Sequence, residues 1–87
     1  MKIEDWRNRI DAMNDEIIAL LNKRAVCAAE IGKLKKELGL PVLDASRENA
    51  VLEAVGEKAV KAGGPLTAES VKKIFQAIME ETRKVED

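Results

Sequence analysis

The N-terminal part of the sequence has the pattern of one very long amphipathic helix. Apolar side chains recur there every three or four residues, and at about 100° per residue they fall on a single face. The pattern continues through Gly32 and stops only at Gly39 and Pro41, residue types that end helices. It predicts a helix of about 36 residues, roughly 54 Å long at 1.5 Å per residue. The apolar stripe consists of Ile3, Trp6, Ile10, Met13, Ile17, Leu20, Leu21, Ala28, Ile31 and Leu38.

The length of this helix constrains how the chain assembles. The sequence has 87 residues, so residues 1–87 are expected to form one small domain. A compact monomer of this size would have a radius of gyration of about 12 Å. A helix of roughly 54 Å would project well beyond such a monomer, with its apolar stripe exposed. We expect a partner to cover the stripe, and a homodimer is the simplest choice because two-fold symmetry is the commonest closed form.

Two further helices are expected after the first. Asp44 is a favourable N-cap for a helix that runs to about Ala62, where Gly63-Gly64-Pro65 ends it. Thr67 caps a third helix that continues to the end of the sequence. No segment alternates in the manner of a strand. The predicted fold is all-α, with three helices per chain, a very long first helix and an intertwined homodimeric helical bundle.

The composition excludes several classes of function. Charged residues make up 36% of the chain, yet the net charge is only -1, without the basic excess expected of a surface for nucleic acid or anionic lipid. There is neither an apolar run of membrane-spanning length nor a secretory signal, so we expect a cytoplasmic protein. Histidine is absent and Cys27 is the only cysteine, which argues against imidazole catalysis, a disulfide and a metal site.

Charged side chains occupy the middle of the apolar face of the first helix. Arg24 and Lys35 lie eleven residues apart, which is three full turns, so both point in the same direction. One isolated lysine in such a position usually extends along the surface to solvent. Two cations centred on one apolar stripe are harder to explain in that way, and they indicate a ligand-binding site.

The other two helices show the same anomaly. Glu48 lies at the centre of the second helix's apolar face with Arg47 beside it, and Thr82 and Glu86 stack one turn apart on the third. Buried charges are costly unless they are paired, and the cations outnumber the two glutamates. A small anionic ligand with carboxylates would supply the missing charge. The residues that predict this site are Arg24, Lys35, Arg47, Glu48, Thr82 and Glu86.

Arg7 extends this prediction to a second chain. It precedes Arg24 by seventeen residues, a separation of roughly 25 Å along the helix axis. It therefore cannot reach the pocket of its own helix. In an antiparallel dimer, the start of one first helix would pass the middle of the other, and Arg7 could enter the neighbouring pocket.

The order of these residues resembles that of the all-α chorismate mutases. No single element is specific to this family. The combined spacing is specific: Arg-x16-Arg-x10-Lys followed by Asp-x-x-Arg-Glu. The resemblance covers essentially the whole chain. The matching elements are Arg7, Ile10-Asp11, Leu20-Leu21, Arg24, Ile31-Gly32, Lys35, Pro41-Val42, Asp44-x-x-Arg47-Glu48, Ile74-Phe75-Gln76 and Glu80-Glu81-Thr82.

The resemblance implies an intertwined dimer that converts chorismate to prephenate at two equivalent sites, without a metal or a cofactor. It implies that Arg24 and the partner's Arg7 hold the substrate carboxylates. Lys35 would contact the ether oxygen and a carboxylate. Asp44 and Arg47 would line the region around the ring hydroxyl, with Glu48 as the acceptor of that hydroxyl.

Two positions depart from the familiar bacterial pattern. Thr82 stands in place of a serine and should still offer a hydroxyl to a carboxylate. Glu86 stands in place of a glutamine that donates to the ether oxygen, and a carboxylate has no proton to donate. Glu86 would have to be protonated to help, so catalysis is expected to strengthen toward acid pH.

Two other functions remain possible on the sequence alone. An isochorismate-pyruvate lyase would share the fold and the cationic pocket, although the run Asp44-x-x-Arg47-Glu48 resembles the mutase pattern. A non-catalytic helical dimerisation module, or a regulatory domain of this type, is the second alternative. The cations on the apolar stripes disfavour it, since a pure scaffold would carry Leu or Ala there.

Overall fold

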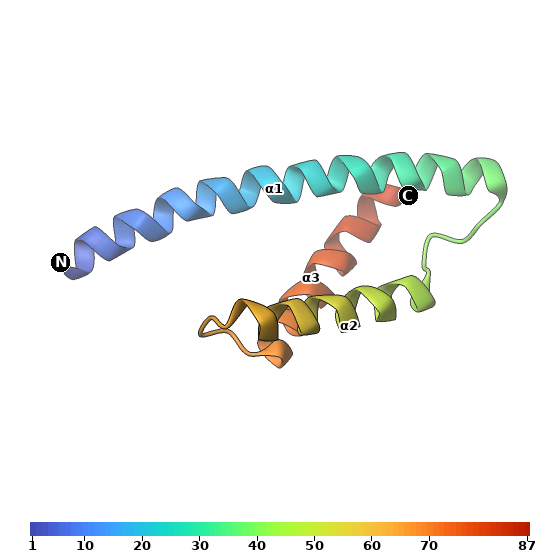
Figure 1. The fold of residues 1–87 in the computed structure, drawn as a ribbon. Helices are drawn as coiled ribbons and strands as arrows, with labels where there is room; N and C mark the ends of the chain where they lie inside the picture. Colours follow the sequence, from blue (N-terminus) through green and yellow to red (C-terminus); the bar gives the residue numbers. More distant parts are fainter.

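The computed structural model describes residues 1–87 and contains three helices and no strand: α1 (Ile3–Leu38), α2 (Ala45–Ala62) and α3 (Ala68–Glu86) (Figure 1). The expected fold class, three helices with a very long first one, is confirmed. α1 has 36 residues, the length that the sequence pattern predicts. None of the three helices combines the length and the apolar composition needed to cross a bilayer.

The helices begin and end at the residues that the sequence marks. Gly39 closes α1 in the left-handed conformation, at φ 68°, which costs a glycine little because it has no Cβ. The Asp44 carboxylate accepts the backbone N–H of Arg47 at 3.0 Å and caps α2. The Thr67 hydroxyl accepts the backbone N–H of Ser70 at 3.1 Å and caps α3. Both predicted N-caps are confirmed.

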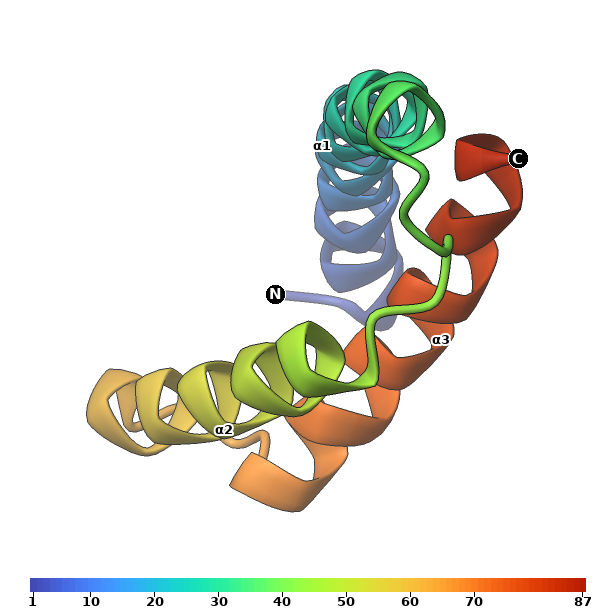
Figure 2. The ribbon, with the colours of Figure 1, turned by 90° about the vertical axis from the view of Figure 1, so that its right-hand side faces the viewer.

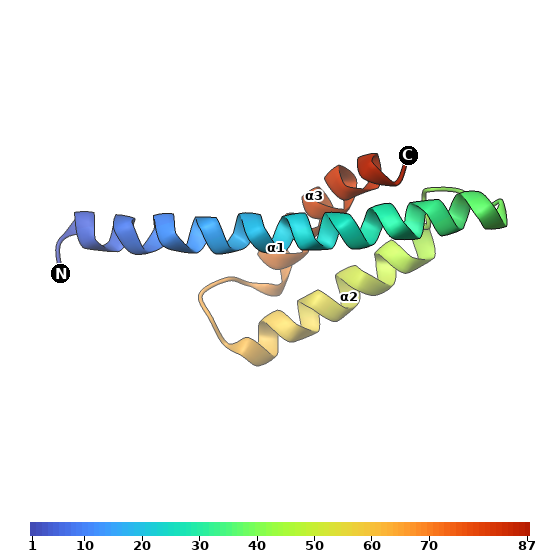
Figure 3. The same cartoon turned by 90° about the horizontal axis from the view of Figure 1, so that it is seen from above.

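α3 holds the molecule together, because it packs against both of the other helices while α1 and α2 make no direct contact. α2 runs back beneath α1, and α3 rises from the end of α2 to the C-terminal half of α1 (Figures 1 and 2). Seen from above, α3 crosses α1 obliquely (Figure 3). The N-terminal half of α1 projects beyond both shorter helices, and the molecule measures 55 × 24 × 15 Å.

Small residues let α3 approach α1 closely. Gly32 is buried, and a Cβ added to it would lie 2.7 Å from the Cα of Glu86. The neighbouring turns of α1 present Ala25, Ala28 and Ala29 to the same contact, each partly buried. This close approach brings the last turn of α3, and with it Glu86, alongside Lys35.

The single chain leaves most of its apolar surface uncovered. Every residue from Met1 to Leu20 is exposed, and Met79 is the only buried hydrophobic side chain. The radius of gyration is 15.8 Å, compared with about 12 Å for a compact chain of this length. The apolar stripe of α1 is therefore as bare as the sequence predicts for an isolated chain.

Replacing Gly32 with alanine is expected to destabilise the fold despite the higher helix propensity of alanine. The new methyl group meets the backbone of Glu86, which cannot turn aside as a side chain can, and overpacking of this kind costs about 1–3 kcal/mol. Gly56→Ala is the matched control, because its methyl group meets only the flexible end of Lys72. That variant should gain up to about 1 kcal/mol from helix propensity. Urea unfolding at one protein concentration measures both, and equal midpoints would contradict the close-contact explanation.

Candidate active site

A pocket of about 220 Å³ lies where the C-terminal half of α1, the start of α2 and the end of α3 meet. Apolar walls come from Ala28, Ile31, Val42, Val51 and Met79. Every site residue that the sequence predicts within one chain also lines it, although these residues are spread over more than sixty positions of the sequence. They are Arg24, Lys35, Asp44, Arg47, Glu48, Thr82 and Glu86.

Arg24 reaches the pocket from α1 and is anchored by α3. Its Nη1 donates to the Thr82 hydroxyl at 2.9 Å, and that hydroxyl donates in turn to the backbone carbonyl of Ile78 at 2.7 Å. No carboxylate pairs with Arg24. A guanidinium has five N–H donors in a planar fork, so most of its donor capacity is available to a ligand.

Lys35 forms the most buried ion pair of the chain. Its Nζ lies 2.6 Å from Glu86 Oε1, and the two side chains are only 16% and 14% exposed. The same ammonium donates to the backbone carbonyl of Val42 at 2.6 Å. An ammonium has three donors, and these two bonds leave one of them for a ligand in the pocket.

Asp44 and Arg47 enter the pocket at the start of α2. One oxygen of Asp44 is committed to the helix cap, since it accepts the backbone N–H of Arg47. Arg47 is an exposed residue of the pocket lining, and its guanidinium makes no hydrogen bond or ion pair within the chain. Like Arg24, it is a cation whose charge no protein group neutralises.

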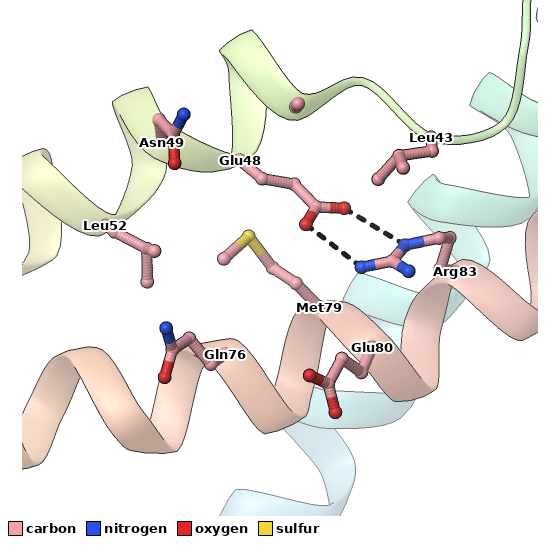
Figure 4. Close-up of a pocket in the computed structure, with 9 residues that line it drawn as sticks. Leu43, Glu48, Asn49, Leu52, Gln76, Met79, Glu80 and Arg83 are labelled. Atoms are coloured by element: carbon pink, nitrogen blue, oxygen red, sulfur yellow. Dashed lines mark hydrogen bonds and ion pairs between the residues drawn. The ribbon is translucent and has the colours of Figure 1, made fainter.

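Glu48 is held by a residue that the sequence analysis missed. Arg83 on α3 forms a bidentate ion pair with its carboxylate, called the Arg83 fork below: Nε donates to Oε2 at 3.1 Å and Nη2 donates to Oε1 at 3.0 Å (Figure 4). Arg83 lies outside the apolar stripe that helix periodicity predicts for α3 and so has the pattern of a solvated surface charge. That stripe consists of Val71, Ile74, Phe75, Ile78 and Val85. Arg83 shares a helix face with Met79, four residues earlier, but periodicity does not predict that Met79 is buried.

Arg7 is the one predicted site residue that the single chain does not bring into the pocket. It is exposed and lies in the second turn of α1, about 25 Å along the axis from Arg24 at 1.5 Å per residue. This agrees with the expectation that Arg7 cannot serve its own pocket.

The charges around the pocket leave a net positive excess. Three cations and three carboxylates line the pocket itself. Arg83, which pairs with Glu48 from outside this lining, adds a fourth cation, and the resulting local excess of one positive charge favours an anionic ligand. No group of three or more acidic, histidine or cysteine side chains is placed to hold a metal ion. The cations are Arg24, Lys35, Arg47 and Arg83, and the carboxylates are Asp44, Glu48 and Glu86.

The fold and the pocket together define an all-α protein with a cation-lined site between three helices. Comparison with known proteins then identifies the family to which the chain belongs. The model of the chorismate mutase type II family matches residues 6–87, nearly the whole chain. The chain therefore belongs to the chorismate mutase type II family.

Individual relatives agree with this assignment. A bifunctional chorismate mutase/prephenate dehydratase of Neisseria gonorrhoeae is 41% identical over 80 residues, which are 92% of this chain and 21% of that protein. A T-protein of Haemophilus influenzae is 34% identical over 80 residues, with the same coverage. The chain thus spans about a fifth of the length of these two relatives.

A solved structure matches the fold over almost the full length of both chains. Form II of the chorismate mutase from Thermus thermophilus superposes with a TM-score of 0.91 at 34% identity, covering 99% of this chain and 94% of that one. The resemblance inferred from the spacing of charged residues is confirmed at the level of the family and the fold.

Proposed function

We propose that this chain is a chorismate mutase, which converts chorismate to prephenate by a [3,3] rearrangement. The observation that supports this most directly is the pocket itself, whose lining includes an ammonium and two arginines that no carboxylate pairs with. The reaction breaks a C–O bond and forms a C–C bond within one molecule. It needs no nucleophile and no proton transfer, and a site without histidine is compatible with it.

The arginines would hold the substrate in its reactive shape. Chorismate is a flexible dianion, and the two ends that must bond meet only in a compact conformer. Fixing that conformer removes an entropy barrier, a task suited to planar guanidinium forks on carboxylates. Arg24 has free donors for this role, and the partner's Arg7 would supply the second guanidinium.

Lys35 would stabilise the charge that develops during the reaction. The ether oxygen gains negative charge as its C–O bond breaks, and a donor already aimed at that oxygen stabilises the transition state more than the substrate. The bonds to Glu86 and the Val42 carbonyl hold the ammonium in place. Its third donor would then meet the ether oxygen without further reorganisation. Glu48, fixed by Arg83, would accept the hydrogen of the ring hydroxyl.

A homodimer would complete each site. The exposed apolar stripe on α1 supports a second copy as the partner, because one surface then covers another of the same chemistry. In an antiparallel arrangement the partner's Arg7 would add a fourth cation to the pocket lining, which holds three carboxylates, and the excess of positive charge would favour the dianion chorismate.

The proposed activity is tested by incubating the protein with chorismate and following the loss of its ultraviolet absorbance. Product identity comes from acid conversion of prephenate to phenylpyruvate, and release of free pyruvate from isochorismate in a parallel assay would instead indicate the lyase. Arg24→Ala serves as the inactive control and Lys33→Ala, which removes an exposed cation from the same helix, as the active one. An unchanged chorismate signal with the wild-type chain would overturn the proposal.

Glu86→Gln is expected to raise kcat for chorismate. In the ligand-free chain the Glu86 carboxylate accepts from Lys35, and a carboxylate has no hydrogen to donate to the ether oxygen. Glutamine at this position carries a permanent donor. Steady-state kinetics at one pH measure the change, and a variant no faster than wild type would contradict a donor role at this position.

A further inference from the structure

Glu48 forms part of the wall between two cavities. Glu48 and Met79 line both the substrate pocket and a second cavity of about 200 Å³ between α2 and α3 (Figure 4). Of these two cavities, Arg83 lines the second and not the substrate pocket. It therefore approaches the carboxylate from behind, on the side away from the proposed substrate, and does not contact that substrate itself.

The Arg83 fork fixes the direction of the Glu48 carboxylate. A glutamate side chain has several rotatable bonds, and one hydrogen bond would still let the carboxylate pivot. Two parallel bonds from a planar guanidinium remove that freedom, and they leave a lone pair on each oxygen for a second donor. No other group in the chain bonds to this carboxylate.

The burial of the pair separates it from the surface ion pairs. Its side chains are 32% and 25% exposed, and only the Lys35–Glu86 pair is more buried. A second ion pair bridges the same two helices, from Lys72 to Glu53, but its atoms are 4.0 Å apart and Glu53 is largely exposed. The two pairs differ in that only the first reaches the proposed active site.

We propose that Arg83 is a positioning residue for the reaction: it aims the Glu48 carboxylate at the ring hydroxyl of the substrate. This inference rests on the proposed function and on the hydroxyl-accepting role of Glu48. Arg83 acts only through Glu48, so its contribution should vanish whenever either the carboxylate or the substrate hydroxyl is removed.

The first test compares two substrates. Arg83→Met is expected to lower kcat/KM for chorismate by about tenfold, the effect of losing one well-aimed bond to a charged group. For an analogue with hydrogen in place of the ring hydroxyl, the variant should stay within about twofold of wild type. A purely structural bridge between α2 and α3 would lower both rates alike, and that result would overturn the proposal. Arg83→Lys keeps the positive charge but cannot form two parallel hydrogen bonds, so its kcat/KM for chorismate should lie between the values of wild type and Arg83→Met.

The second test asks whether Arg83 acts through Glu48. In a Glu48→Ala background, adding Arg83→Met should change kcat/KM for chorismate by less than about twofold. A full tenfold loss there would overturn the proposal. Lys72→Met, which breaks the other α2–α3 pair, should match wild type, and circular dichroism and sedimentation verify that each variant is folded and assembled.

Different results would overturn the proposed function and the proposed role of Arg83. A wild-type chain that leaves chorismate unchanged overturns the proposed function, and the role of Arg83 in it is overturned as well. An active wild type with an equally active Arg83→Met variant overturns the inference on Arg83 alone.

Discussion

Replacing Lys35 with methionine is expected to lower kcat for the rearrangement of chorismate by about 10²–10³-fold, with a smaller change in KM. The ammonium is the one pocket cation held by two protein bonds, to Glu86 and to the Val42 carbonyl. A donor held in this way loses little freedom when charge develops on the ether oxygen. Methionine keeps the length of the side chain and removes both the charge and the donors.

Lys36→Met is the matched control for this prediction. Lys36 is the next residue of the same helix, and it also bonds to the end of the chain, donating to the Asp87 carbonyl at 2.8 Å. It is exposed and does not line the pocket, so its loss should leave kcat within about twofold. Similar rates for the two variants would remove Lys35 from the mechanism.

The acidic partner of Lys35, Glu86, needs a control of its own. Lys35→Met leaves the Glu86 carboxylate only 14% exposed and without its cation, which destabilises the contact between α1 and α3. The double variant Lys35→Met/Glu86→Gln removes that unpaired charge. We expect it to recover thermal stability without recovering kcat, whereas recovery of both would assign the loss to misfolding.

The helices were predictable because their signals are local. Gly39, Asp44 and Thr67 act on backbone groups within a few residues of themselves, so a single sequence contains all the information that fixes the ends of the helices. The pocket residues were predictable for a related reason. A cation such as Arg24 on an apolar stripe is an exception that periodicity exposes without knowledge of the fold.

What could not be predicted depends on how α2 and α3 pack. The expected stripe of α3 included Ile74 and Val85, yet both are nearly half exposed, while Met79, outside that stripe, is buried. The face turned toward α2 is set by the approach of two helices, and helix periodicity alone does not give the direction of that approach. Arg83 was missed for this reason: its partner Glu48 lies 35 positions away.

Mixing two inactive variants is expected to restore about a quarter of the wild-type activity if the partner's Arg7 completes each site. Arg7→Ala and Arg24→Ala each damage both sites of a homodimer. In a mixed dimer, one site receives an intact Arg7 from one chain and an intact Arg24 from the other, while the second site loses both. Random exchange makes about half of the dimers mixed, and one of their two sites is whole.

The stoichiometry makes this test specific for a site shared between chains. If Arg7 acted on its own pocket, every chain in the mixture would still have one damaged arginine, and the activity would stay at the level of the separate variants. The exchange is achieved by unfolding and refolding the two chains together at equal concentration, because an intertwined dimer exchanges subunits slowly. Sedimentation equilibrium of the refolded mixture verifies that dimers have formed. A folded, active monomer would contradict both the role of Arg7 and the interpretation of the bare stripe on α1.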